Sequence, residues 1–236
     1  AAMGGLGSGV ASGLYALVGY LPGGWRALYI IAGISILYIV WLRRLLPETR
    51  LFDQHAQRAT TQDFWQPVLE IFRHHGRALT AIALIAAAFV FQLSATINFM
   101  SKYLQETHHY APQEVSLLFI VAGSIALFGT TTAGRISDHI GRRPTLIAAL
   151  LLNCAATIAF YNSGGWLLPL AWIISLFSFF AIEVMISAIG GELFPTSCRS
   201  TAATLRAICT TFAAVAGLAM QGILFNALGS HAAALS

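Results

Sequence analysis

Long uncharged apolar stretches alternate with short polar segments along most of this chain. A helix rises about 1.5 Å per residue, so about 20 residues cross the hydrocarbon core of a bilayer. The pattern therefore predicts seven transmembrane helices in an all-α membrane protein. They cover approximately Ala2–Leu21, Ala27–Leu42, Ala78–Met100, Val115–Gly134, Thr145–Tyr161, Trp166–Gly190 and Ala202–Leu228.

One polar segment is much longer than the others and runs from Arg43 to Arg77. Within it, Phe64–Phe72 alternates apolar and polar residues as an amphipathic helix would, and we expect its apolar side to lie on the membrane interface. A long charged segment between groups of apolar helices indicates a boundary between two units of structure.

The composition supports a membrane protein. The chain is 57% apolar and only 9% charged, whereas soluble domains carry about 25% charged residues. If the long segment faces the cytoplasm, eleven of the 13 Lys and Arg residues lie on that side, as the positive-inside rule requires. The net charge of +4 follows from this asymmetry, and we expect no nucleic-acid partner.

Candidate chemistry is sparse. The three cysteines suggest no disulfide pair, and neither a nucleophile elbow, a phosphate-binding loop nor a zinc motif occurs. We therefore expect no enzymatic activity, no cofactor and no metal site.

A short hydrophilic turn, Gly134–Pro144, carries one acid and three arginines between two apolar stretches. It resembles the signature cytoplasmic loop of the major facilitator superfamily, which runs Gly, Asp, then Gly-Arg-Arg, although His139 stands where that family usually has Arg. The resemblance implies transport across a membrane by a twelve-helix carrier. The matching residues are Gly134, Asp138, Gly141, Arg142 and Arg143.

Two further segments support the resemblance. Leu46–Arg50 is similar to the element that closes the first half of sugar-porter-like members, and Glu192–Arg199 is similar to the Glu-Leu-Phe-Pro-Thr element between helices ten and eleven. Their order implies that the seven predicted helices are helices five to eleven of the twelve. Residues 1–42 would then end the N-terminal half, 43–77 would form the central linker, and 78–236 would form the C-terminal half without its last helix.

We expect the charged motif residues to form an inner gate that opens and closes during transport. Asp138 is predicted to cap the following helix and to pair with arginine, and Glu192 to meet Arg142 or Arg143. Glu48 and Arg199 are expected to join the same gate. Alternatively, the arginines only set the topology by attraction to anionic lipid.

Few polar residues lie inside the predicted spans. Glu183 is the acid placed deepest, and a charge there costs several kcal/mol unless it is paired, hydrated or protonated. Trp172 lies on the same helix face, so both are candidates for lining a solute cavity, together with Gln92 and Asn98 of another span. Each of these polar groups could equally form hydrogen bonds between helices.

The resemblance implies a secondary active transporter of a small polar metabolite, either a sugar or an organic acid, that works by alternating access. We expect proton-coupled symport in a bacterial inner membrane, with the missing helices and membrane lipid as partners. Two alternatives stay open at this point: a drug-efflux antiporter, and a transporter-like receptor that binds solute without moving it.

Overall fold

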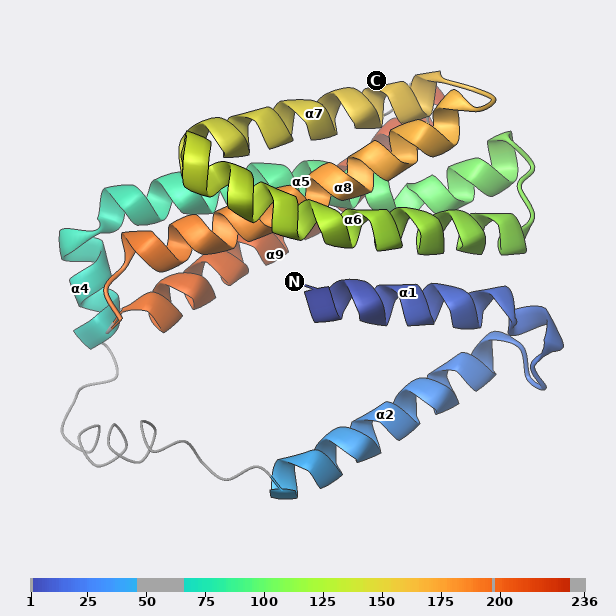
Figure 1. Ribbon diagram of the computed structural model, residues 1–236, viewed down its shortest axis with the longest axis horizontal. Coiled ribbons are helices and arrows are strands. Elements are labelled where there is room, and N and C mark those ends of the chain that lie inside the picture. The colour runs from blue at the N-terminus through green and yellow to red at the C-terminus, as the bar shows by residue number, and fades with distance from the viewer. Residues whose placement is uncertain (1, 46–65, 197, 230–236) are drawn as a thin grey trace.

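The structure is a computed structural model that describes residues 2–45, 66–196 and 198–229, and within these ranges its regular elements are helical (Figure 1). Glu48 of the predicted gate lies outside the described residues. The elements are α1 (Ala2–Ala16), the 3-10 helix η1 (Val18–Tyr20), α2 (Trp25–Leu45), α4 (Gln66–His74), α5 (Gly76–Thr107), α6 (Pro112–Ile140), α7 (Arg142–Asn162), α8 (Leu167–Leu193) and α9 (Arg199–Leu228).

Six of the described helices, α2 and α5 to α9, are long and apolar enough to cross a membrane. The first predicted span forms only the 15-residue helix α1, which is shorter than the bilayer core requires. The chain reverses soon after it, where Gly23 and Gly24 adopt positive φ angles of 88° and 57° that glycine tolerates best. That this segment spans the membrane stays a prediction.

The hydrophilic segment Gly134–Pro144 is mostly helical, which differs from the turn that the sequence predicts. Helix α6 continues through Gly134 to Ile140, and α7 begins at Arg142. Only Gly141 breaks the helix, with φ 108° and ψ 154°, a conformation that side chains with a Cβ rarely adopt. A helix continues through polar sequence as long as its backbone hydrogen bonds are kept. The polarity of this segment therefore indicates where the chain leaves the membrane, but not where the helix ends.

Helices α5 to α9 pack in two groups (Figure 1). Helix α8 lies against both α6 and α7, while α5 lies against α9. Helix α1 packs along α6, whereas α2 leaves most of its apolar side chains exposed. The short helix α4 packs against the ends of α5 and α9 and buries Ile71 completely, although Leu69 and Phe72 stay exposed.

Two glycines set the closest approaches between helices. A Cβ on Gly217 of α9 would lie 2.3 Å from the carbonyl oxygen of Phe91 in α5. A Cβ on Gly129 of α6 would lie 2.9 Å from the ring of Phe177 in α8. Both distances are shorter than real side-chain contacts, so glycine is required where these helix pairs cross.

The buried apolar side chains form two clusters at different depths of the bundle. One lies toward α4 and includes Ile82, Phe89, Ile182 and Met185. The other lies toward the α5–α6 connection and contains an aromatic group, with Tyr103, Phe160, Tyr161 and Trp172 among its members. Each cluster draws on several helices, so together they hold α5 to α9 in one body.

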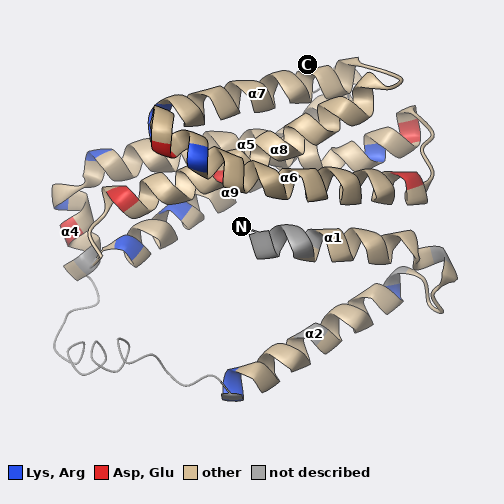
Figure 2. Ribbon diagram, in the orientation of Figure 1, with Lys and Arg blue, Asp and Glu red and all other residues tan. Residues whose placement is uncertain are grey.

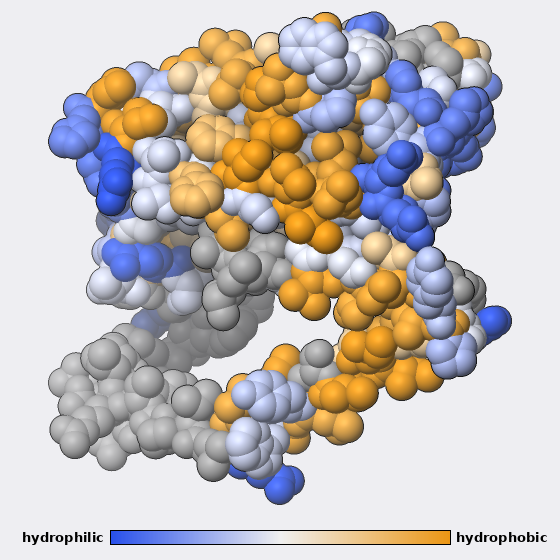
Figure 3. Space-filling view, turned by 45° about the vertical axis from the view of Figure 1, so that its right-hand side comes forward, coloured by the Kyte–Doolittle hydropathy of each residue, from blue (hydrophilic) through white to orange (hydrophobic). Residues whose placement is uncertain are grey.

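Charged side chains concentrate at the end of the bundle that carries α4 and the α6–α7 junction, at the left of Figure 2. We call this the charged end. In the face shown in Figure 3, apolar side chains gather across the middle of the bundle and hydrophilic ones toward its ends. This is the surface that a bilayer would surround. The described arginines at the charged end are Arg73, Arg77, Arg135, Arg142, Arg143, Arg199 and Arg206.

Because α5 and α9 cross closely, replacing two different glycines of α9 by alanine should change the stability of the protein to different extents. Gly217→Ala should destabilise the purified protein by roughly 1–3 kcal/mol, because the new methyl group overpacks the contact with Phe91. Gly222→Ala is the matched control, since a Cβ there meets nothing within 4 Å. It should be neutral or gain up to about 1 kcal/mol from helix propensity. Thermal unfolding in detergent measures both, and equal midpoints would contradict the close crossing.

Candidate functional site

The charged motif residues meet at Arg142, the first residue of α7. Its guanidinium lies 2.8 Å from the Asp138 carboxylate in the last turn of α6 and 3.0 Å from the Glu192 carboxylate near the end of α8. It also donates a hydrogen bond to the hydroxyl of Ser137. One arginine therefore joins the ends of three helices, and we call this group the Arg142 junction.

The sharp turn at Gly141 makes this geometry possible. It brings the start of α7 back over the end of α6, so Asp138 and Arg142 face each other although a helix break separates them. The predicted ion pairs with Asp138 and Glu192 are both present. The predicted helix cap is wrong, because Asp138 belongs to α6 and the start of α7 receives no side-chain cap.

Other members of the predicted gate do not join the junction. Arg143 and Arg199 are exposed, and neither forms an ion pair within the part of the chain that the structure describes. Gly134 lies inside α6 and does not contribute to the turn. The sequence did not indicate Ser137, although its position one residue before Asp138 places it at the same helix end.

The junction is open to water. The side chains of Asp138 and Glu192 are 60% and 57% exposed, and that of Arg142 is 31% exposed. Ion pairs of this kind contribute roughly 0–1 kcal/mol each, because water can replace the partner at little cost. The arrangement holds three helix ends together weakly, which suits contacts that must break and re-form.

Buried polar groups form a separate layer between the two apolar clusters. The Asn153 amide of α7 donates to the Ser175 carbonyl and the Ser178 hydroxyl of α8, both at 3.0 Å. The Thr157 hydroxyl lies 3.4 Å from the Ser175 hydroxyl. Gln92 of α5 donates to Thr157 at 3.4 Å, so this layer ties three helices together.

The candidate solute-binding residues are therefore not gathered in one place. Gln92 belongs to the polar layer, and Asn98 is exposed with its amide bonded to the Ser94 carbonyl of its own helix. Trp172 is fully buried against the rings of Phe119 and Phe160.

Trp172 and Glu183 are predicted to share a helix face and to line a solute cavity, but the Trp172 side chain is fully buried. Helices α6 and α7 cover the side of α8 that carries Trp172. Glu183 is half-buried and makes no ion pair within the described ranges. Sequence spacing gives the angle of a residue around its helix, but it does not tell which neighbouring helix covers that angle.

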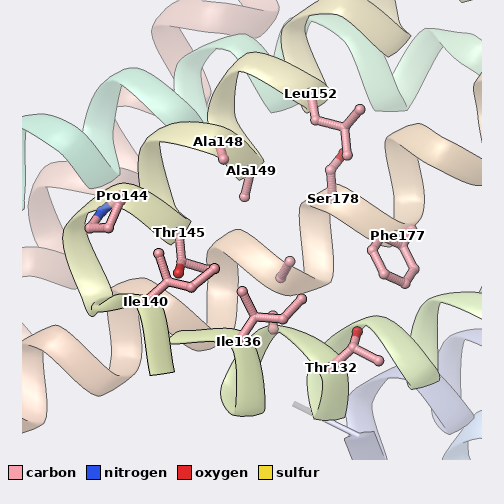
Figure 4. A pocket seen from close by; sticks show the side chains of 12 residues that line it. Thr132, Ile136, Ile140, Pro144, Thr145, Ala148, Ala149, Leu152, Phe177 and Ser178 are labelled. Atoms are coloured by element: carbon pink, nitrogen blue, oxygen red, sulfur yellow. The ribbon is translucent and has the colours of Figure 1, made fainter. Parts of the chain in front are cut away.

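An apolar groove of about 350 Å³ lies next to the junction, between α6, α7 and α8 (Figure 4). Ile136, Ile140 and Leu152 line it. The hydroxyls of Thr132 and Thr145 donate to carbonyls of their own helices. The groove therefore offers little for the recognition of a polar solute, and it suits an apolar chain better.

Comparison with known proteins identifies the family of this chain. The Major Facilitator Superfamily profile matches residues 82–236, and the chain belongs to that family. The Escherichia coli K12 proline/betaine transporter is 34% identical over 236 aligned residues, covering 90% of this chain and 45% of the transporter. The Dickeya dadantii glycine betaine/proline/ectoine/pipecolic acid transporter OusA is 29% identical over 217 residues, covering 84% of this chain and 42% of OusA.

A solved structure agrees in fold. The inward-facing, unoccupied bacterial homologue of the human lysosomal transporter Spinster superposes with a TM-score of 0.61 at 17% identity, over 87% of this chain and 47% of that one. The chain spans about half the length of the curated relatives it matches. Membership of this family, together with the apolar helices, makes the chain part of an integral multi-pass membrane protein.

The polar layer predicts a cost for losing its central amide. Asn153→Ala should destabilise the purified protein by about 1–2 kcal/mol, because two interhelical hydrogen bonds are lost. Asn162→Ala is the control on the same helix, since the Asn162 amide is exposed and bonds only within α7. Thermal unfolding in detergent compares the two variants, and similar losses at both positions would argue against the layer.

The Arg142 junction predicts a small, salt-sensitive coupling between two helices. A double-mutant cycle with Arg142→Gln and Glu192→Gln compares the free energies of unfolding of the single and double variants. It should give a coupling energy of roughly 0.2–1 kcal/mol, as exposed ion pairs do. The coupling should shrink in 1 M salt, where the screening length falls to about 3 Å. Additive effects at low salt would show that the two side chains do not interact in solution.

Proposed function

We propose that the complete protein is a secondary active transporter and that this chain supplies helices five to eleven of its twelve. Residues 1–42 would close the N-terminal half, 43–77 would link the halves, and 78–236 would belong to the C-terminal half. The packing supports this division, because α5 to α9 share their apolar clusters whereas α2 is largely exposed. An exposed apolar helix of this kind would contact lipid or the missing helices.

The observation that carries the proposal is the Arg142 junction. A carrier alternates between two conformations, and each needs contacts that the other can release. The junction joins α6, α7 and α8 through exposed ion pairs, while the buried polar layer fixes α7 against α8 deeper in the bundle. Weak contacts at the helix ends would let these ends shift against the N-terminal half as the inner mouth opens, while the buried contacts keep α7 and α8 together.

The solute would be a small polar metabolite, and a small zwitterion or organic acid is favoured over a sugar. The names of two relatives support this, since both include proline and betaine. Proton-coupled symport stays the expected coupling, and Glu183, the half-buried acid of α8, stays a candidate for lining the solute path. The relatives come from bacteria, so the inner membrane is the expected location.

Uptake assays test the proposal. The complete carrier, reconstituted in proteoliposomes, should accumulate labelled proline or betaine when a proton gradient is imposed. Asp138→Asn and Glu192→Gln should each change the balance of inward-open and outward-open states by about fivefold, corresponding to about 1 kcal/mol. Cysteine accessibility from each side measures that balance, and initial uptake rates measure its consequence.

Glu106→Gln is the matched control, because it also removes one acid from an exposed ion pair, but at the opposite end of the bundle. It should leave both readouts unchanged. Solute binding without flux would favour a receptor, and export of apolar drugs would favour an efflux antiporter. If Asp138→Asn and Glu192→Gln both behave like the unmodified protein, the gating role of the junction is wrong.

A further inference from the structure

A second cavity, of about 270 Å³, lies at the charged end between α5, α8 and α9. Two arginines of α9, Arg199 and Arg206, line it. They are seven residues apart, so they share one helix face and lie about two turns, or roughly 10 Å, from each other along the axis. The residues between them on this face of α9 are Ala202 and Ala203, whose side chains are small.

The opposite wall of this cavity combines small residues with apolar ones. Helix α8 contributes Ser187, Gly190 and Gly191 together with Ile186, and Ile82 and Phe194 complete the wall. A Cβ on Gly190 would come 3.4 Å from Ile82, and a Cβ on Gly191 would meet nothing within 4 Å. Ser187 offers a hydroxyl on this wall. The cavity therefore combines two cationic donors with a largely apolar wall, in which Ser187 supplies one hydroxyl group.

The charges of this cavity are not balanced within the described part of the chain. Neither Arg199 nor Arg206 forms an ion pair there, and Glu192, the nearest acid in sequence, pairs with Arg142. Arg206 is half-buried, and a charge with reduced access to water costs free energy unless a counter-charge or a hydrogen-bond partner meets it. Arg206 also lies seven residues beyond the Glu192–Arg199 segment that resembles a family motif, so that resemblance gives it no role.

We propose that this cavity is an anion subsite at the inner mouth of the carrier, where the carboxylate of the transported solute binds to Arg206 and Arg199. The planar guanidinium group matches a carboxylate with paired hydrogen bonds. A neutral sugar would leave both cationic groups without a counter-charge. The inference rests on the proposed transport function and narrows its solute class to molecules with an anionic group.

The test uses the complete carrier in inside-out vesicles, where the inner mouth faces the medium. The probes are proline and prolinamide, which differ in that a neutral amide replaces the carboxylate. Arg206→Gln should raise the half-saturating proline concentration at this face by about 10–100-fold, because a charge-assisted hydrogen bond of roughly 1.5–3 kcal/mol is lost. Prolinamide should compete weakly with proline, and Arg206→Gln should leave this competition unchanged.

Two further variants separate the subsite from general damage. Arg206→Lys should recover part of the proline affinity, because it keeps the charge but not the paired geometry. Gly191→Leu retains both arginines but fills the cavity, and it should weaken proline binding at the inner face as Arg206→Gln does. Arg77→Gln is the control for charge, because it removes an exposed arginine of the same end that lies outside this cavity, and it should have no effect.

The same assay identifies the source of the anion. In pure phosphatidylcholine the effect of Arg206→Gln should persist. An effect that appears only with phosphatidylglycerol would assign the cavity to a lipid phosphate and overturn the solute assignment. If the unmodified carrier transports proline but Arg206→Gln and Gly191→Leu leave inner-face affinity unchanged, the subsite is wrong although transport stands. If the unmodified carrier moves no solute, the proposed function itself fails.

Discussion

The bundle depends on two close helix crossings at glycine, Gly217 and Gly129. At Gly217, α9 approaches the α5 backbone at Phe91, and at Gly129, α6 approaches α8 at Phe177. Lipid tails are as apolar as leucine, so helices in a bilayer associate mainly through close packing and hydrogen bonds. These crossings fix which helices are neighbours. The apolar clusters, the polar layer and the grouping of the charged helix ends all follow from that arrangement.

Polar interactions in this bundle divide by depth. The bonds around Asn153 are buried, and their loss would leave polar groups without water to replace the partner. The ion pairs of Arg142 are exposed, so water can take the place of either carboxylate. Interior bonds therefore keep α7 and α8 together as a unit. The exposed pairs add only a weak and reversible preference at the helix ends.

Arginines at the charged end have different surroundings although they look alike in sequence. Arg142 is the centre of an ion-pair junction, Arg143 is exposed, and Arg206 lines a cavity with Arg199. The turn at Gly141 determines the environment of Arg142, because it directs the start of α7 back over α6. The crossing of α5 and α9 determines the environment of Arg206 and Arg199. A guanidinium group takes its role from the surfaces around it.

The sequence by itself determined the helical membrane fold, because apolar runs of this length leave backbone groups no partner but their own helix. It also predicted that Asp138 pairs with an arginine and that Glu192 meets Arg142 or Arg143, because charges at the cytoplasmic ends of helices suit a gate. Only the tertiary structure decided that Asp138 ends a helix instead of capping the next one, because one positive φ angle at Gly141 places the break. It alone showed that Trp172 is buried, that Gln92 bonds Thr157, and that Arg199 and Arg206 share a cavity. Helical periodicity gives the angle of each side chain, but the packing of α6 to α9 decides what that side chain meets.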